Sequence, residues 1–276
     1  IRHLGRSRLG FRLLSSSAMK KLFLILLYIS PWTSLFPGDY PKKRLFDRDQ
    51  HAAKILGRED RKYGDHSGNR VLCRFYNQGS IGDQSSSFSG VYPVGSGHSY
   101  IWEFSPVIAA SVLDTSGNRK RIVSDGLRGL VDVSPEGTPW SFEPIAGYAN
   151  PNQENLAMSD NSSTWPSTWP NRDEDWDGEW NGQYGKYVRA DQESYFVMDD
   201  YYNSEYEFWP DLSDTPESSL ESPDDHRRGL GIDLEVRGYQ WNHPAAEDII
   251  IVTYWITNIG SKTLDSVVFG MYGDAD

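Results

Sequence analysis

The sequence contains a single cysteine, Cys73, among its 276 residues. One thiol cannot form an intrachain disulfide, so a cross-linked fold is excluded. Cys73 lies in the apolar stretch 71–75, where a small buried side chain is a more ordinary role than a reactive thiol. The sequence also lacks the signatures G-x-S-x-G, H-E-x-x-H and G-x-x-x-x-G-K-S/T. Hydrolases with a nucleophile elbow, zinc proteases and P-loop enzymes are therefore poor candidates.

Positive charge is scarce. The chain carries 27 Lys+Arg against 39 Asp+Glu, a formal net charge of -12 at pH 7. Residues 1–38 hold six of the 27 basic residues and no acidic one, so the remainder has 21 basic against 39 acidic side chains, a net charge of -18. Such a surface repels phosphate backbones and anionic lipids. We therefore expect no nucleic-acid partner, and we regard cations as better partners.

Long apolar runs are few, and the most informative one is short. Residues 19–21, Met-Lys-Lys, precede an apolar run at 22–29, and Ser-Pro follows at 30–31. A basic start, a short apolar core and a break are typical of a secretory signal peptide. The run is shorter than the ~20 residues that cross a bilayer, so we expect no membrane insertion once the signal is cleaved. The sequence predicts a secreted or bacterial cell-surface protein.

Composition divides the chain into five regions. Residues 1–18 are rich in arginine and contain no acid, which fits either translated upstream sequence or a transit peptide. We take residues 1–38 as this upstream sequence plus the signal peptide. The other regions are a linker with a short helix near 47–57 (39–68), a β-rich region (69–150), an acidic Trp- and Tyr-rich insertion (151–226) and an incomplete antiparallel sheet (227–276).

The β-rich region carries local strand and turn signals. Residues 71–76 have a short apolar strand pattern, and residues 106–113 are apolar. We expect residues 119–123 to pair back with 106–113, because the connector 114–118, Asp-Thr-Ser-Gly-Asn, supplies turn chemistry. The fold class that we expect is mainly β, with antiparallel β-sandwich modules of immunoglobulin-like type and a loop-rich acidic aromatic insertion.

The last region has the clearest strand pattern. Apolar and charged side chains alternate over residues 230–237, so we expect one face to be buried and one wet. The apolar phase shifts by one residue after Gly238, which predicts a β-bulge there. Residues 249–256 are apolar on both faces, as in a central strand, and a turn leads to a third strand at 264–272. Because three strands do not complete a sandwich, we expect a reading frame truncated at Asp276.

The sharpest local motif is acidic. Asp173, Asp175 and Asp177 occupy positions 1, 3 and 5 of a loop with glycine at position 6, as at the start of an EF-hand-type calcium loop. Alternate carboxylates converge on one ion when glycine permits a sharp turn, and Glu179 would supply its backbone carbonyl. Position 12 is Tyr184 instead of a bidentate glutamate. Calcium binding by these acids is one hypothesis, and a solvated acidic turn is the alternative.

The same insertion is rich in tryptophan. Exposed rings beside carboxylates suit stacking on sugar faces, and the candidate glycan-binding residues are Trp165, Trp169, Trp176 and Trp180. The alternative is that these rings pack on the neighbouring sheet as a small core of the insertion. Carboxylate pairs for glycoside hydrolysis are available among Glu179, Glu193, Asp199 and Asp200. So acidic a region offers such pairs by chance, and we assign no catalytic residue.

Five stretches carry a resemblance to a known family. They are 88–98 (FSGVYPVGSGH), 176–182 (WDGEWNG), 191–200 (DQESYFVMDD), 236–241 (VRGYQW) and 269–272 (FGMY). They resemble uncharacterised secreted or surface bacterial proteins that carry a C-terminal type IX secretion sorting domain. The resemblance implies surface display or release, often with immunoglobulin-like or fibronectin-type modules, and it transfers no catalytic residue.

Two functional hypotheses follow. The leading one is an exported, non-enzymatic surface or extracellular protein that acts in adhesion or scaffolding, with calcium stabilising residues 173–179. The alternative is a carbohydrate-active protein, a glycan-binding module or a glycoside hydrolase, that uses the Trp165–Trp180 surface. Its partners would be extracellular glycans or cell-surface components. A concave cleft lined by the tryptophans and two carboxylates favours the alternative, whereas tryptophans buried against the sheet favour the leading hypothesis.

Overall fold

The described residues are mainly β. A computed structural model describes residues 58–275, apart from 84–85, 128–131, 136, 138 and 213–225, and the backbone of 26–28. Within this part of the chain, helix is limited to the 3-10 turns η2 (Arg58–Asp60), η3 (Ser162–Thr164) and η4 (Glu174–Trp176). None of the described residues belongs to a helix of the length and apolar character needed to span a bilayer.

Sheet A is the largest sheet. Its strands lie in the order β1 (Leu26–Tyr28), β11 (Ile251–Asn258), β10 (Ile232–Gln240), β9 (Gln192–Asp199) and β7 (Glu143–Pro144), and β8 (Ala157–Met158) also pairs with β9. The pairs are antiparallel except that β1 runs parallel to β11. Strand β1 is the part of the predicted signal peptide that the structure describes, and the helix predicted near 47–57 lies outside the described residues.

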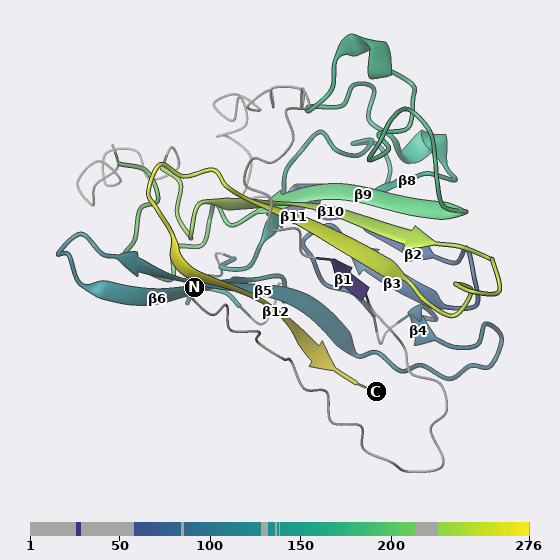
Figure 1. Cartoon of the computed structure of the whole chain (residues 1–276), viewed down its shortest axis with the longest axis horizontal. Coiled ribbons are helices and arrows are strands. Elements are labelled where there is room, and N and C mark those ends of the chain that lie inside the picture. Colours follow the sequence, from purple (N-terminus) through teal and green to yellow (C-terminus); the bar gives the residue numbers. More distant parts are fainter. Residues whose placement is uncertain are drawn as a thin grey trace, which may run out of the picture.

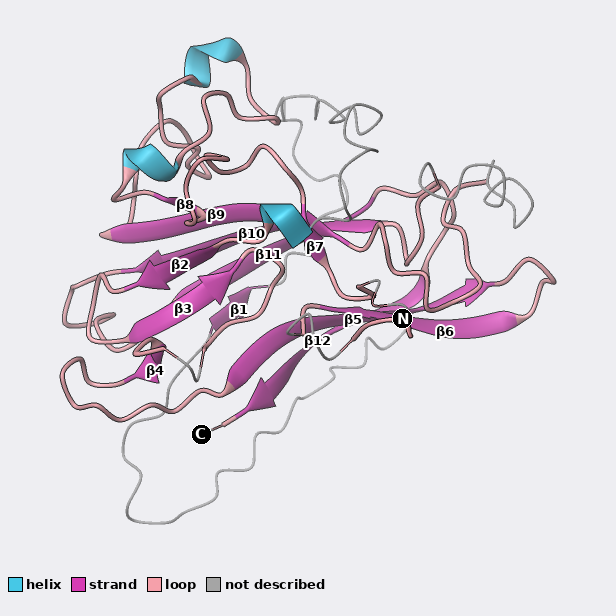
Figure 2. Cartoon of the chain, turned by 180° about the vertical axis from the view of Figure 1, so that it is seen from behind, coloured by secondary structure: helices cyan, strands magenta, loops and turns pink. Residues whose placement is uncertain are grey.

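Two three-stranded sheets face sheet A. The β5 sheet has the order β12 (Asp265–Asp274), β5 (Glu103–Leu113) and β6 (Arg119–Asp125), and the β3 sheet has the order β2 (Tyr63–His66), β3 (Leu72–Tyr76) and β4 (Ser89–Val91). Ile81 links these two sheets, because it bridges to both Phe75 and Phe104. Figure 1 and Figure 2 show both sheets on one side of sheet A, while the loops around β8 and the short helical turns η3 and η4 cover its other side.

The predicted hairpin is confirmed. Strands β5 and β6 pair antiparallel along the whole of β6. In the turn, Asp114 Oδ1 accepts hydrogen bonds from the backbone N–H of Ser116 (3.0 Å) and of Asn118 (2.7 Å), as expected of an aspartate that closes an Asx-turn. The strand predicted at 71–76 is β3. Strand β2 falls at the end of the stretch 39–68, which the sequence predicts as a linker.

The main core lies between sheet A and the two facing sheets. Strand β9 contributes Phe196 and Met198 to it, and β10 contributes Leu234 and Val236. Burying such side chains removes apolar area from water, which is the dominant stabilising term in folding. Cys73 is a buried free thiol of this core, and burial raises its pKa to about 12. The prediction of a small buried side chain at Cys73 is therefore confirmed.

The outer face of β10 departs from the prediction of a wet face. Asp233 and Arg237, the charged residues expected there, are 3% and 1% exposed. The alternation correctly predicts which side chains share a face, but the loops of the insertion cover that face. A similar cover explains why β9, buried at every residue, lies unnoticed within the predicted loop-rich insertion, since a strand buried on both faces shows no alternation.

The predicted β-bulge at Gly238 is wrong. The strand register continues unbroken, with Gly238 opposite Ser194 on β9 and Val252 on β11. The glycine is needed for close packing instead, because a Cβ at this position would lie 2.6 Å from His66 Nε2 and 2.8 Å from Phe75 Cε2. Glycine in a strand often marks such a close approach. Here it lets β2 and β3 pack directly on sheet A.

Candidate functional site

Rings from the insertion form a second, smaller core on the outer face of sheet A. This aromatic layer consists of the buried residues Tyr148, Ala157, Trp169, Trp180, Tyr195 and Val197, with Ile145, Trp165 and Trp176 packed against them. Tyr195 and Val197 belong to β9, whose other face lies in the main core. The ring centroids of Trp169 and Trp180 are 5.9 Å apart and nearly perpendicular, a favourable edge-to-face arrangement. The layer therefore fastens the insertion to the sheet.

The central tryptophans of this layer have no free face for a ligand. Trp169 and Trp180 are 3% and 2% exposed. The Trp169 Nε1–H donates to the carbonyl of Glu179 (2.9 Å), and the Trp180 Nε1–H donates to Glu193 Oε2 (2.8 Å). Both buried indole donors are thus satisfied, as packing residues require.

Trp165 and Trp176 lie half-buried at the edge of the layer. The Trp165 ring is 5.4 Å from the Trp180 ring, and its Nε1–H donates to the carbonyl of Met158 (2.7 Å). The guanidinium carbon of Arg172 lies 4.3 Å from the centroid of Trp176. Two of the four predicted glycan-binding tryptophans, Trp169 and Trp180, are therefore buried against the sheet, and the other two pack against them with part of their surface exposed.

Arg237 ties the insertion to β10, and Arg172 links two segments within the insertion. Arg237 of β10 is buried, and its guanidinium carbon lies 3.8 Å from the centroid of Tyr195. Arg237 Nη1 donates to the carbonyl of Asn181, and Arg172 Nε donates to Asn181 Oδ1 (2.7 Å). Burial lowers the pKa of Arg172. These bonds explain how a charged residue of β10 is accommodated beneath the insertion.

The predicted calcium loop lies on the surface of the insertion. Asp173, Asp175, Asp177 and Glu179 are all exposed. Asp175 Oδ2 accepts a hydrogen bond from Lys186 Nζ (2.7 Å). Among the described residues, no three or more His, Cys, Asp or Glu side chains form a group that could hold a metal ion. The structure therefore does not bring the four acids together, and calcium binding by them stays a prediction.

Of the four carboxylates considered for hydrolysis, Glu179 is exposed in the insertion, and Glu193, Asp199 and Asp200 lie at the two ends of β9. Glu193 Oε1 accepts from two backbone N–H groups, at 2.6 and 3.0 Å. Asp200 accepts from two backbone N–H groups that precede and begin β10, at 2.6 and 3.0 Å, and desolvation raises its pKa to about 6. A strand rises ~3.3 Å per residue, so Glu193 and Asp199 lie about 20 Å apart, which exceeds the roughly 5–10 Å of a glycosidase pair.

A serine–histidine pair lies between the sheets. His66 Nε2 is 2.8 Å from Ser194 Oγ, and both residues are fully buried. This distance suits a nucleophile and its base. However, burial lowers the pKa of His66 to about 4, and Ser194 Oγ also accepts from the N–H of Gly238 (3.2 Å). We interpret the pair as a bond that satisfies two buried polar groups.

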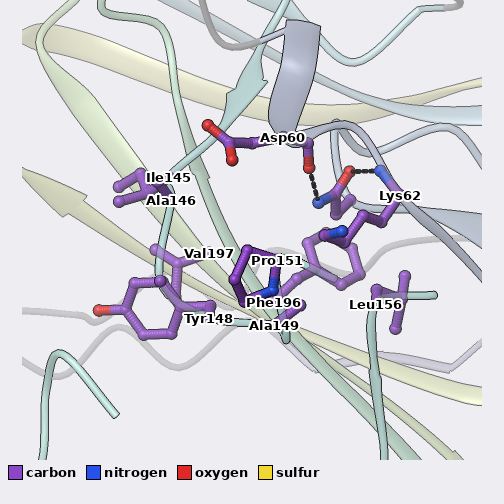
Figure 3. Close-up of a pocket in the computed structure, with 12 residues that line it drawn as sticks. Asp60, Lys62, Ile145, Ala146, Tyr148, Ala149, Pro151, Leu156, Phe196 and Val197 are labelled. Carbon is purple, nitrogen blue, oxygen red and sulfur yellow. Dashed lines mark hydrogen bonds between the residues drawn. The ribbon is translucent and has the colours of Figure 1, made fainter. Parts of the chain in front are cut away.

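A cavity of about 280 Å³ opens beside the aromatic layer (Figure 3). It is lined by Asp60, Lys62, Asn77, Ile145, Ala146, Gly147, Tyr148, Ala149, Pro151, Leu156, Phe196 and Val197. Its polar wall is held by hydrogen bonds from the Lys62 N–H to Asn77 Oδ1 (2.7 Å) and from Asn77 Nδ2 to the Asp60 carbonyl (2.8 Å). Burial lowers the pKa of Lys62. The hollow is mainly apolar, and Asp60, Lys62 and Asn77 form its polar wall.

Sequence patterns did not reveal the serine–histidine pair or the cavity. His66 and Ser194 are 128 residues apart in the sequence and come from different sheets, so no local motif contains both. The cavity is assembled from three segments, around residues 60–77, 145–156 and 196–197, and none of them has a distinctive pattern.

The chain matches no protein-family model, no curated protein and no solved structure.

Proposed function

We propose that this chain is an exported, non-enzymatic protein of the bacterial cell surface or the extracellular space, and that it acts in adhesion or scaffolding. We further infer that its facing antiparallel sheets are an immunoglobulin-like β-sandwich. The signal-peptide pattern at residues 19–31 supports export, as does the resemblance of stretches within 88–276 to secreted bacterial proteins with a type IX sorting domain. The carboxylate surplus favours cations and neutral surface components over nucleic acid.

The observation that carries the proposal is the aromatic layer. It holds the described loops of the insertion, within 151–190, against β9, so this acidic surface has a fixed place on a sheet. Loops positioned by a rigid scaffold are where proteins usually place their binding surfaces. The same layer uses the tryptophans and Glu193 in packing and hydrogen bonding, which favours a binding or structural role over hydrolysis at these residues.

Calcium is the ion that we propose as a stabiliser of the 173–179 loop. The loop carries exposed carboxylates at alternate positions, and Asp175 already attracts one cation, the ammonium of Lys186. A calcium ion would stabilise the protein to the extent that it binds the folded loop better than the unfolded chain.

Export is tested by expressing the full chain in its bacterial host. We expect the product outside the cytosol, with an N-terminus beyond residue 29 by intact mass, so that the exported form lacks the edge strand β1 and sheet A ends at β11. Leu24→Arg, in the apolar run, should block export because it destroys the apolar core of the signal. The matched change Leu212→Arg, at an exposed position, should leave export intact. Full-length, uncleaved product in the cytosol of the native host would contradict the proposal.

The non-enzymatic role is tested on the exported product and on a strain that lacks it. The strain should adhere less well to glycan-coated surfaces, and the purified product should release no reducing ends from polysaccharides. Unchanged adhesion would contradict the adhesion role. Release of reducing ends that disappears in Glu193→Gln would instead favour the carbohydrate-active alternative.

A further inference from the structure

Beside the end of β10, aromatic rings reach the surface instead of packing in the aromatic layer. Tyr184 and Tyr187 are 68% and 50% exposed. Arg189 is exposed, and Trp241, which directly follows β10, is half-buried. We call these four residues the aromatic platform. None of them is among the tryptophans that the sequence suggests for glycan binding.

Arg189 orients the two tyrosines. Its guanidinium carbon lies 5.0 Å from the ring centroid of Tyr184 and 4.9 Å from that of Tyr187. Its Nη2 also donates to Tyr187 Oη (2.6 Å). Stacking of a guanidinium on ring faces is favourable at exposed sites. The rings are therefore ordered before a ligand arrives, which reduces the side-chain freedom lost on binding.

Trp241 connects the platform to sheet A. Its ring is stacked on Tyr239 of β10, with centroids 5.8 Å apart and planes 14° apart. The Trp241 Nε1–H donates to the carbonyl of Arg189 (3.2 Å), and the N–H of Asn242 donates to Asp191 Oδ2 (2.6 Å). Two segments that are distant in the sequence are thus fastened into one surface.

The charges of the platform and of the chain disfavour two classes of ligand. The guanidinium of Arg189 already lies over both tyrosine rings and bonds a neutral hydroxyl, so it occupies the position that a cationic ligand would take on these rings. The net charge of -12 for the whole chain repels an extended polyanion. A neutral ligand meets neither obstacle, and a polyhydroxylated one offers oxygen acceptors to Arg189 and to the tyrosine hydroxyls.

We propose that the aromatic platform binds a neutral polysaccharide. The rings of Tyr184, Tyr187 and Trp241 stack on the C–H faces of sugar rings, and Arg189 donates hydrogen bonds to sugar oxygens. Tyrosine and tryptophan supply such contact area with little loss of conformational freedom. The proposal rests on the proposed function, because an exported chain meets extracellular glycans. It places the glycan surface away from Trp169 and Trp180, whose rings are buried.

The test measures binding of the exported product to immobilised β-glucan, xylan, mannan and α-glucan, with polygalacturonate as an acidic comparison. We expect binding to at least one neutral polymer. The double variant Tyr184→Ala/Tyr187→Ala should weaken it at least about tenfold, as the loss of two aromatic contacts predicts. The matched control Tyr272→Ala removes a ring that is 43% exposed on β12, in the β5 sheet, and should bind as wild type does.

The double variant Tyr184→Phe/Tyr187→Phe keeps the rings and should retain most of the binding, so loss of stacking is separated from loss of the fold. Absence of binding to every neutral polymer would overturn the proposal, as would equal binding by the Ala/Ala variant or binding to polygalacturonate alone. Location separates the two proposals. Cytosolic product contradicts export whether or not it binds, whereas an exported, folded product that binds no neutral polymer overturns the platform alone.

Discussion

The two faces of β9 and β10 are both buried, but they are stabilised differently. The inner face presents apolar side chains such as Met198 and Leu234 to a core shared by three sheets. The outer face presents Tyr195 and Arg237 to the aromatic layer. There Tyr195 Oη accepts from Asn171 Nδ2 (2.8 Å), and Arg237 donates to loop carbonyl and amide oxygens. Apolar burial has no preferred direction, whereas the outer face depends on specific partners in one insertion.

This difference predicts how far the effect of a mutation spreads. Loss of an inner-face side chain removes area from the core that all three sheets share, so stability should fall throughout the fold. Loss of an outer-face contact releases the insertion from the sheet, so the opening should be local. Hydrogen exchange distinguishes the two, because it reports the opening of each segment separately.

The largest effect is expected from Trp180→Ala on the outer face. Truncating a buried tryptophan typically costs about 3–5 kcal/mol, and this one also leaves Glu193 Oε2 without its indole donor. We expect exchange protection to be lost over residues 160–190 and retained in β10. Trp180→Phe, which keeps a ring, should lose less. Equal loss of protection in β10 and in the insertion would show that the outer face does not open locally.

The next effect is expected from Leu234→Ala on the inner face. Leu234 is fully buried in β10, and such truncations cost about 2–5 kcal/mol according to how well the cavity collapses. Here protection should fall together in β5, β9 and β10, and urea should unfold the variant in a single transition at lower concentration. A loss of protection confined to the insertion would show that the main core does not stabilise the three sheets together.

His66, the last residue of β2, contacts Ser194 on the inner face of β9. Its burial predicts that the stability of the fold depends on pH. Desolvation lowers its pKa from 6.5 to about 4, so the unfolded chain binds a proton in this range that the folded protein does not. The neutral ring therefore contributes fully to the free energy of unfolding above about pH 6.5, and this contribution is lost as the pH falls towards 4. The lowering corresponds to roughly 3 kcal/mol.

The measurement is the free energy of unfolding of wild type minus that of His66→Phe, by urea titration from pH 7 to pH 4. The raised pKa of Asp200, about 6, acts in the opposite direction, since its contribution falls as the pH rises from about 4 to 6. That contribution is common to both proteins and cancels in the difference. The difference should shrink on acidification, and parallel curves would show that His66 titrates normally in the fold.

A smaller effect is expected from Arg237→Met. The change removes the stacking on Tyr195 and leaves the Asn181 carbonyl without its donor, and an unsatisfied buried group costs about 1–3 kcal/mol. Exchange should accelerate over 171–182, while Arg121→Met, the same change at an exposed position of β6, should change little. A stabilised Arg237→Met would mean that the buried guanidinium is a net burden, as buried charges can be.

The sequence predictions succeeded for local features and for the inner face of β10, and they failed for its outer face. The β5–β6 hairpin was predictable because its signals are local: an apolar run at 106–113 and an Asp-x-x-Gly-Asn turn directly before 119–123. The inner face of β10 was predictable from the alternation of its apolar residues. Its outer face was not, because the cover comes from residues 145–180, more than 50 positions before β10. The periodicity of a strand does not indicate whether a distant segment covers it.

The candidate site was predicted in composition but not in arrangement. The sequence correctly marked residues 165–180 as aromatic and acidic, yet tryptophan rings stack on sugars or on one another with the same chemistry. The choice depends on whether β9 presents Tyr195 and Val197 to them, and β9 itself shows no alternation. The prediction of a β-bulge at Gly238 was wrong for a related reason. A glycine in a strand marks either a bulge or a close approach, and the residue that approaches Gly238, His66, lies on another sheet.

The smallest effect is expected from calcium, at the exposed rim of the insertion. A loop of extracellular type binds with a Kd on the order of 10⁻³ M, so about 10 mM calcium should stabilise the folded form by ~1.4 kcal/mol and raise Tm by roughly 3 °C relative to chelator. Lys186 competes for Asp175, so Lys186→Gln should increase the shift and Asp177→Asn should abolish it. Asp265→Asn, at an exposed acid of β12, should leave it unchanged. A Tm that is equal in calcium and in chelator for wild type and Lys186→Gln alike would leave 173–179 as a solvated acidic turn, and the outer face would then depend on its rings and arginines alone.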